Sequence, residues 1–305
     1  MDRSRFPPGL TPFAKVEALG NDLIWILDPA ASNSVREMSR RAPRVCDRRL
    51  GVGADGIVLW NGASHNPELW FLNADGSTAE VCGNGLRALA VGGRDLGFFM
   101  PGSICFRITD AVFPVEIAGP GFPSAVGLGI PRFRASPALD EILGAWDASG
   151  ALVFMPNPHI VVFDGPEARE RQEKLAAELV SAVAGGANVG FCTTRDESIE
   201  LEVLERGVGW TRACGSGAAA AAAATWRAGR FASEVTRVRQ PGGILRVWPD
   251  PEGRIWIEGE AGLVFLGFLP PDEQAEGCGA GWNVMRRGLG VLGRRWPGID
   301  GDCHD

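Results

Sequence analysis

The stretch Arg212-Ala-Cys-Gly-Ser-Gly-Ala-Ala-Ala-Ala-Ala-Ala-Ala-Thr-Trp-Arg227 carries the strongest local structural signal in the chain. A glycine turn at Cys214 opens into seven consecutive alanines, which favour a helix and are small enough for close packing. The same order occurs earlier, where Cys82-Gly-Asn-Gly85 opens into a stretch of helical periodicity. The two cysteines are 132 positions apart, one in each half of the chain. The two turns therefore predict a pair of helices that each begin at a cysteine.

The sequence around each of these turns follows one plan. Phe13–Leu27 is typical of strand, turn and strand, with Asn21 in the turn, and Leu152–Phe163 has the same pattern around Asn157. A charged helical stretch and further short strands follow in each half. These matched halves indicate an internal duplication with a period of domain size.

The duplication gives an expected division of the chain. We expect an N-terminal domain over 1–122, to which a return segment at about 264–275 belongs, and a C-terminal domain over 123–263. Residues 276–305 are rich in Gly and Arg with weak patterning and are expected to form a tail. A length of 305 residues agrees with two domains of about 150 residues.

Composition narrows the class of protein. The net charge is −7 and arginines are scattered, so a nucleic-acid partner is not expected. No run approaches the ~20 apolar residues of a membrane span, and the first residues lack the apolar region of a secretory signal. We therefore expect a cytoplasmic protein that does not bind membranes.

Cysteine usage argues against structural metal or disulfide chemistry. Seven cysteines are widely and irregularly spaced and form no Cys-x-x-Cys pair, so we expect no zinc site, no other metal site and no disulfide framework. Most free cysteines in such a chain are small buried hydrophobic residues. Cys82 and Cys214 differ because each precedes a helix.

A cysteine at a helix N-terminus lies among unpaired N–H groups and the positive end of the helix dipole, which favour the thiolate. The N–H groups of Gly83-Asn84 and Gly215-Ser216 would form an anion site beside it. In a duplicated fold the two helix ends would face each other across a cleft. This arrangement suits removal of a proton from the carbon next to a carboxylate by one thiolate, with a proton returned to the opposite face by the other thiol.

Other chemistries fit less well. Gly51-Val-Gly-Ala-Asp-Gly56 matches the dinucleotide-binding pattern, but Ile57–Trp60 predicts a strand where that site needs a helix. A Cys-His hydrolase would need an orienting histidine among only three, and a redox dithiol would need two sulfurs in contact. With two lysines and no tyrosine, a pyridoxal phosphate aldimine and Tyr-based acid–base chemistry are also disfavoured.

At these motifs the chain resembles the diaminopimelate epimerase family. The resemblance runs in the family's order over about residues 13–268, through Phe13-x-Lys-x3-Leu-Gly-Asn-Asp22, Gly51–Asp55, Asn73–Ser77, Val81–Arg87, Asn157–His159, Asn188-Val189, Glu205–Gly209, Ala213–Gly217 and Pro241–Gly243. It implies an α/β (α+β) fold of two pseudo-symmetric domains, each a curved β-barrel-like sheet around a central helix. It also implies a homodimer, no cofactor, and interconversion of LL- and meso-diaminopimelate.

The resemblance also implies roles for particular residues. Cys82 and Cys214 match the catalytic pair, and His159 matches a residue beside them. The backbone donors to the reacting carboxylate match Gly83, Asn84, Gly215 and Ser216. The side chains that hold the distal carboxylate match Asn73, Asn157, Asn188 and Arg206. Glu205 matches the partner of the distal amine, and Asn21 matches one further substrate contact.

The chain departs from the family pattern at two notable positions. Trp210 stands where Glu is usual, a change expected to alter pocket shape or a thiol pKa, and Gly56 stands where some members supply a substrate-contacting Gln. Two alternatives therefore stay open. One is a racemase of another amino acid, such as histidine, with the same two-thiol mechanism, and the other is a catalytically silent amino-acid-binding homologue.

Overall fold

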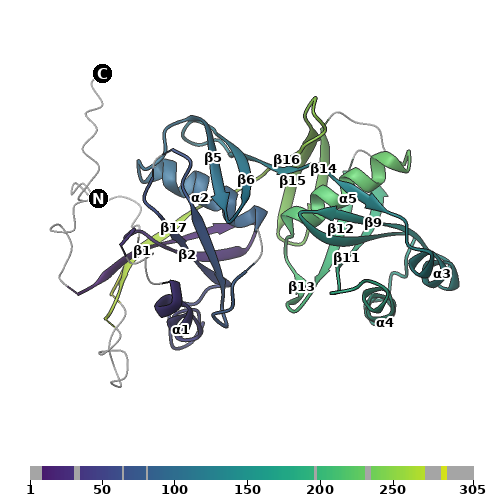
Figure 1. The fold of residues 1–305 in the computed structure, drawn as a ribbon, viewed down its shortest axis with the longest axis horizontal. Coiled ribbons are helices and arrows are strands. Elements are labelled where there is room, and N and C mark those ends of the chain that lie inside the picture. Colours follow the sequence, from purple (N-terminus) through teal and green to yellow (C-terminus); the bar gives the residue numbers. More distant parts are fainter. Residues whose placement is uncertain are drawn as a thin grey trace.

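The computed structural model describes residues 9–30, 35–63, 65–79, 82–195, 198–230, 235–271 and 283–286. Figure 1 shows two lobes side by side, one built around helix α2 (Gly83–Asp95) and the other around helix α5 (Gly215–Arg227). The prediction of two helices that each begin at a cysteine is confirmed, since Cys82 and Cys214 are their N-cap residues. Of the predicted tail over 276–305, only 283–286 lies within the described residues.

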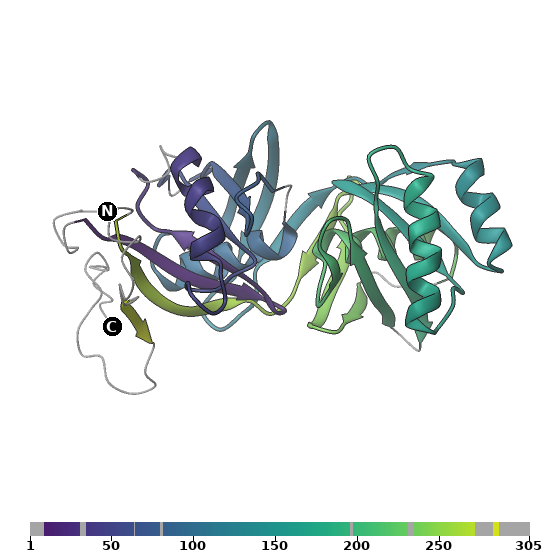
Figure 2. The same cartoon turned by 90° about the horizontal axis from the view of Figure 1, so that it is seen from below.

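The first sheet has the strand order β18-β17-β1-β2-β3-β4. Its neighbours pair antiparallel except β2 and β3, which are parallel and joined through helix α1 (Val35–Val45). From below, the yellow-green β17 is seen to return to the first lobe, where it pairs with β1 (Figure 2). The strands of this sheet are β1 (Thr11–Ala18), β2 (Asn21–Ile26), β3 (Gly56–Trp60), β4 (Leu69–Asn73), β17 (Gly262–Leu269) and β18 (Asn283–Arg286).

The predicted strand, turn and strand over 13–27 is confirmed as β1 and β2. The turn itself is Leu19–Gly20, with φ of 53° and 86°, and Asn21 is already the first residue of β2. The pairing of Ala18 with Asn21 leaves only these two residues in the turn, and both have the positive φ that a two-residue hairpin turn uses.

The second sheet has the order β5-β6-β7-β16-β15-β14-β12-β11-β10-β9-β8, with β13 paired to β12. Pairing of β7 with β16 makes it continuous from the first lobe to the second. Its strands are β5 (Gly102–Ile108), β6 (Ala111–Ile117), β7 (Ala125–Gly129), β8 (Arg132–Arg134), β9 (Ser149–Met155), β10 (Asn157–Phe163), β11 (Asn188–Arg195), β12 (Ser198–Glu205), β13 (Gly209–Thr211), β14 (Thr236–Gln240), β15 (Gly243–Pro249) and β16 (Ile255–Glu258).

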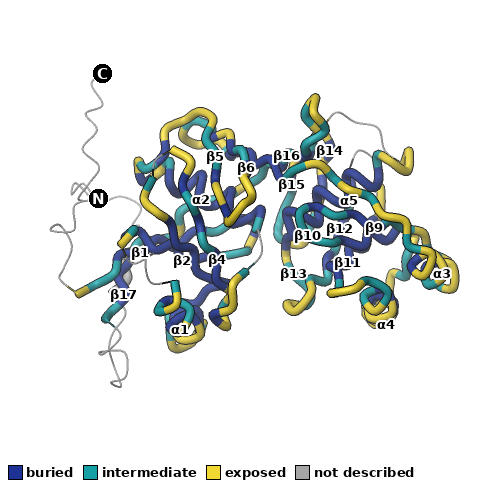
Figure 3. The backbone as a smooth tube through the Cα atoms, viewed as in Figure 1, coloured by how far each residue is buried: buried dark blue, intermediate teal, exposed yellow. Residues whose placement is uncertain are grey.

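The two central helices are almost wholly buried, whereas the outer helices α1, α3 (Pro137–Ala145) and α4 (Arg169–Ser181) bury only one face (Figure 3). In α5 the alanines 218–222 are completely inaccessible, because strands surround the helix and leave room only for methyl groups. In α2, Gly93 permits the close approach of Phe99, since a Cβ there would lie 2.2 Å from the ring.

The expected mixed α/β class and the two sheet-wrapped helices are confirmed, but the sheets are open. Among the described strands each sheet runs from one edge strand to another and does not close into a barrel. No helix in the described ranges combines the length and apolar character that a membrane span requires.

Candidate active site

The two cysteines occupy equivalent places at the ends of the central helices. Each has an extended backbone, and each sulfur accepts a hydrogen bond of 3.3 Å from a backbone N–H three residues later, Gly85 for Cys82 and Gly217 for Cys214. This is the N-cap geometry normally supplied by Ser, Thr, Asn or Asp. Both sulfurs thus lie among the free N–H groups of a helix N-terminus.

The two helix ends abut. Asn84 Nδ2 donates a hydrogen bond of 2.8 Å to the carbonyl oxygen of Ala213, the residue before Cys214. A Cβ on Gly215 would lie 3.4 Å from Gly83 Cα, which is van der Waals contact, and 2.9 Å from Ile257 Cδ1, so the two helix ends pack directly on each other at their glycines. The expectation that the helix N-termini face each other is confirmed by these contacts.

The carbonyl and N–H of the Ala213–Cys214 peptide are both held by side-chain amides. Asn84 binds the carbonyl, and Gln240 Oε1 accepts 2.8 Å from the Cys214 N–H. Asn84 is itself fixed by Arg87, whose Nη2 donates 2.8 Å to Asn84 Oδ1. Arg87 is fully buried and also donates to the Glu260 carbonyl. The sequence analysis did not single out the side chains of Gln240 and Arg87.

The surroundings of Cys82 come from the β1–β2 turn. Its Sγ lies 3.3 Å from Asn21 Oδ1, while Asn21 Nδ2 donates 3.0 Å to Asp55 Oδ2. The turn reaches the second lobe, since a Cβ on Gly242 would lie 2.0 Å from the Leu19 carbonyl oxygen. The close backbone approach explains the Pro-Gly-Gly motif at 241–243.

The surroundings of Cys214 are more polar. Ser216 Oγ lies 3.6 Å from the sulfur and 3.1 Å from Nε2 of His159. Glu205 hydrogen bonds to Cys214 and accepts 2.6 Å from the Thr211 hydroxyl. The structure therefore brings His159, Glu205 and Ser216 together beside this thiol.

Burial controls the acidity of both thiols. It raises the pKa of Cys82 to about 11 and that of Cys214 well above its ordinary value, and the Glu205 carboxylate adds to both shifts. The N–H groups of Gly85 and Gly217 lower these pKa values, as expected at helix N-termini, but by less than burial raises them. At neutral pH both side chains are therefore thiols in the unliganded site, contrary to the expectation that the helix ends favour thiolate.

Burial also sets the charge of the two groups beside Cys214. It lowers the pKa of His159 to about 3, so the imidazole is neutral. It raises the pKa of Glu205, against hydrogen bonds from Thr211 and Cys214 that lower it. Glu205 is thus a carboxylate of increased basicity beside a thiol.

The residues expected at the distal end of the substrate are only partly gathered. Strand pairing sets His159 opposite Asn188, whose Oδ1 accepts 2.9 Å from the Arg206 N–H. Asn73 Nδ2 instead donates to Ser77, and Asn157 opens β10 opposite Met155. Among the described residues, neither asparagine side chain forms a hydrogen bond with a cysteine.

The two departures from the family pattern lie outside the thiol surroundings. Trp210 faces α4, where its Nε1 donates 2.9 Å to Glu173 and the Arg169 guanidinium lies 3.8 Å above its ring. The expectation that Trp210 alters the cysteine pocket is therefore not supported by its contacts. At Gly56 a Cβ would lie 2.4 Å from the Leu72 carbonyl oxygen, so this backbone has no room for the Gln found in some relatives.

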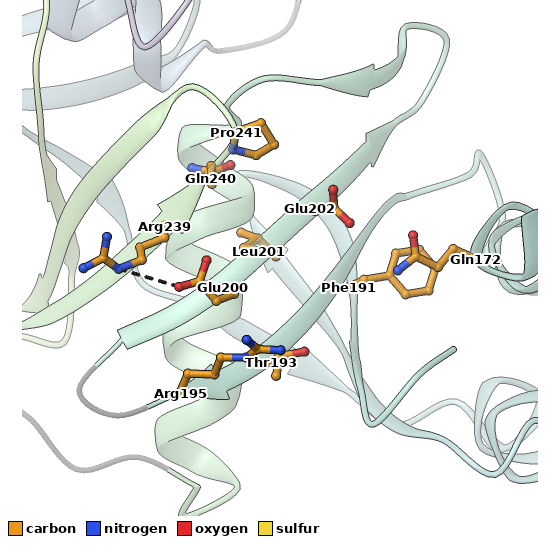
Figure 4. Close-up of a pocket in the computed structure, with 10 residues that line it drawn as sticks. All are labelled: Gln172, Phe191, Thr193, Arg195, Glu200, Leu201, Glu202, Arg239, Gln240 and Pro241. Atoms are coloured by element: carbon orange, nitrogen blue, oxygen red, sulfur yellow. Dashed lines mark ion pairs between the residues drawn. The ribbon is translucent and has the colours of Figure 1, made fainter. Parts of the chain in front are cut away.

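A separate hollow of about 440 Å³ lies on the second lobe (Figure 4). It is lined by β11, β12 and β14, with the ion pair between Arg239 and Glu200 across it. Neither Cys82 nor Cys214 lines it, although one of its lining residues, Gln240, also accepts the hydrogen bond from the Cys214 N–H. Among the described residues no group of three His, Cys, Asp or Glu side chains could hold a metal ion.

Comparison of folds finds solved structures with the same overall architecture as this chain. A predicted epimerase from Pseudomonas aeruginosa superposes with a TM-score of 0.65 at 15% identity, covering 85% of this chain and 99% of that one. A hydroxyproline epimerase from Agrobacterium vitis gives a TM-score of 0.61 at 12% identity over 87% of this chain and 94% of its own. At these identities the likeness concerns the fold alone.

Sequence comparison is more specific. The family model described as diaminopimelate epimerase matches residues 13–100 and 151–264. A diaminopimelate epimerase from Desulforudis audaxviator is 36% identical over 273 residues, covering 84% of this chain and 98% of its own. One from Microcystis aeruginosa is 31% identical over 282 residues, with 85% and 99% covered. The chain therefore belongs to the diaminopimelate epimerase family.

Proposed function

We propose that this protein is a diaminopimelate epimerase that interconverts the LL and meso isomers without a cofactor. The observation that carries the proposal is the pair of N-capping cysteines on two abutting helix ends. The choice of diaminopimelate as the substrate is supported by relatives named diaminopimelate epimerase, which align over more than four-fifths of this chain.

In the proposed reaction one cysteine removes the α-hydrogen as a proton and the other donates a proton to the opposite face of the carbon. The electron pair of the C–H bond moves into the carboxylate. The N–H groups of Gly83-Asn84 and Gly215-Ser216, at the positive ends of α2 and α5, stabilise the charge that develops there. The Glu205 carboxylate, which hydrogen bonds to Cys214, accepts the proton that this thiol must lose.

The same proposal gives the second amino-acid head of the substrate its contacts. An arginine with several asparagine amides suits a carboxylate, and a glutamate suits an ammonium group. We assign the distal carboxylate to Asn73, Asn157, Asn188 and Arg206, the distal amine to Glu205, and a further contact to Asn21. Binding of this amine would draw Glu205 toward the substrate, which links recognition to the charge beside Cys214.

The test is α-hydrogen exchange in D2O with a panel of amino acids. Diaminopimelate is expected to exchange and epimerise, and Cys82→Ser and Cys214→Ser are expected to abolish epimerisation, whereas Cys105→Ser is not. Exchange on histidine but not on diaminopimelate would support the racemase alternative. Ligand binding without exchange on any amino acid, retained in Cys82→Ala and Cys214→Ala, would support the silent homologue.

We further propose that the chain acts as a cytoplasmic homodimer, with domains over 1–122 plus 264–275 and over 123–263. A reaction without pyridoxal phosphate, which would need a lysine for its aldimine, agrees with the placement of the two lysines. Lys15 is buried in an ion pair of 2.6 Å with Asp22, and Lys174 pairs with Glu170 on the outer helix α4. Light scattering of the purified chain tests the dimer, and limited proteolysis tests the domain boundaries.

A further inference from the structure

The amide of Asn21 bridges a carboxylate and a cysteine. Its Nδ2 lies 3.0 Å from Asp55 Oδ2, and its Oδ1 lies 3.3 Å from Cys82 Sγ. A carboxylate accepts hydrogen bonds and donates none, so Asp55 fixes which end of the amide faces it. The carbonyl oxygen of Asn21 must then face the sulfur, where it can only accept the thiol hydrogen.

The Asp55 carboxylate is itself held by several donors. Arg48 Nη2 donates 2.7 Å to Asp55 Oδ1 and 2.7 Å to Asp22 Oδ1, and the Asp22 N–H donates 3.0 Å to Asp55 Oδ2. The orientation of Asn21 is therefore set by a network of charged groups in the first lobe rather than by Cys82.

The two thiols consequently differ. Cys82 has an acceptor at Asn21 and a donor at Gly85, both satisfied by the neutral thiol. Among the described residues no side-chain amide is hydrogen bonded to Cys214 Sγ; the sulfur instead lies beside the Glu205 carboxylate and the Ser216 hydroxyl. Charged groups that act on Cys82 include Glu205 of β12, which raises its pKa, and Arg87 of α2, which lowers it.

We propose that Asp55 is a positioning residue that orients Asn21 so that Cys82 is held as the proton donor, which leaves Cys214 as the thiol that is deprotonated to act as the base. The inference rests on the proposed two-cysteine function. Cys214 first passes its proton to Glu205. Its thiolate then takes the α-hydrogen as a proton, the C–H electron pair moves into the carboxylate, and Cys82 gives its S–H proton to the other face. One proton then moves through solvent from Glu205 to Cys82, which restores both thiols and the Glu205 carboxylate.

Substitution of Asp55 by Asn is expected to reverse the orientation of the Asn21 amide. The single oxygen of the new amide is expected to stay with the charged Arg48, which turns its NH2 group toward Asn21 and breaks the hydrogen bond from the Asp22 N–H. Asn21 then has to flip and present its own NH2 to Cys82, an arrangement that favours thiolate. Asp55→Glu keeps an acceptor-only group and is expected to retain most of the wild-type orientation.

The experiment measures alkylation by iodoacetamide of Cys82 and Cys214 in the folded protein, resolved by peptide mass spectrometry from pH 6 to 10. In Asp55→Asn the Cys82 rate at pH 8 is expected to rise by about tenfold, the effect of one pKa unit. The Cys214 rate is expected to stay unchanged, and Asp55→Glu to restore the Cys82 rate. Asp47→Asn, in the same loop, removes a carboxylate that accepts from the local N–H groups of Arg49 and Leu50, and it serves as the matched control.

Turnover adds a second readout. In Asp55→Asn, kcat/KM is expected to fall by the same factor in both directions, because the equilibrium constant between the isomers is fixed. An unchanged Cys82 rate, or equal increases at both cysteines, would overturn the inference. Alkylation needs no substrate, so a selective rise at Cys82 in a protein that exchanges no amino acid would leave the inference standing while the proposed function fails.

Discussion

Asn84, the second residue of α2, donates a hydrogen bond of 2.8 Å to the carbonyl of Ala213, which immediately precedes Cys214 at the start of α5. This bond joins the two lobes at the point where both thiols are fixed. A side chain from the first lobe thus helps to position the cysteine of the second. We therefore expect the spacing of the two thiols to depend on this bond, and misplacement of reacting groups by about 1 Å is costly in rate.

Replacement of Asn84 tests this contact. In Asn84→Ala the buried Ala213 oxygen and Arg87 Nη2 lose their partner, so the free energy of unfolding is expected to fall by about 1–3 kcal/mol. In Asn84→Asp the carboxylate can pair with Arg87 but cannot donate to Ala213, so stability is better retained. Both variants are expected to lose at least about tenfold in kcat. Wild-type turnover in Asn84→Asp would show that the lobes are fixed elsewhere.

Gly242 is expected to be intolerant of a side chain. A Cβ there would lie 2.0 Å from the Leu19 carbonyl, so Gly242→Ala must displace the turn that carries Asn21. We expect a loss of about 1–3 kcal/mol of stability and a marked fall in kcat, measured by urea unfolding and epimerase assay. Gly144→Ala in α3, with no heavy atom within 4 Å of the added methyl, is the control and should leave activity unchanged.

The chemistry of the site could be predicted from local sequence because it depends on local backbone structure. A glycine turn that opens into a helical stretch is sufficient to place Cys82 and Cys214 at N-caps. The pairing of β7 with β16 then makes one sheet continuous between the two lobes. Local signals for a helix are also present at α3, where Ser136 is the N-cap and Pro137 lies in the first turn, but the sequence analysis does not predict this helix.

Contacts between distant segments could not be predicted in this way. The bonds of Gln240 to the Cys214 N–H and of Asp55 to Asn21 join residues 26 and 34 positions apart, and only packing determines that they meet. The thiol pKa shows the same limit, since the helix-end effect is local whereas burial, which outweighs it, is a property of the whole fold.

The role of Trp210 also depends on contacts with residues that are distant in the sequence. Its indole packs under Arg169 and donates to Glu173, both on α4, so its role is to hold that helix on the sheet. Trp210→Ala is expected to lower the free energy of unfolding by about 1–2 kcal/mol and to leave kcat within about twofold. Unchanged stability with a large loss of kcat would mean that the ring acts on the catalytic site after all.

His159 makes stability depend on pH. Burial lowers its pKa from 6.5 to about 3, so below pH 6.5 the unfolded chain gains a proton that the folded chain does not. The stabilisation is complete above pH 6.5 and is lost as pH falls toward 3, at about 1.4 kcal/mol per pH unit. Between pH 7.5 and 5.0, wild type is therefore expected to lose about 2 kcal/mol more than His159→Gln in urea unfolding. Asp22, with a pKa of about 2, contributes stability that is complete above pH 3.8 and is lost only as pH falls toward 2, below this window. Equal losses in the two proteins would show that the imidazole is already protonated in the fold, and the neutral Ser216–His159 contact beside Cys214 would then have to be abandoned.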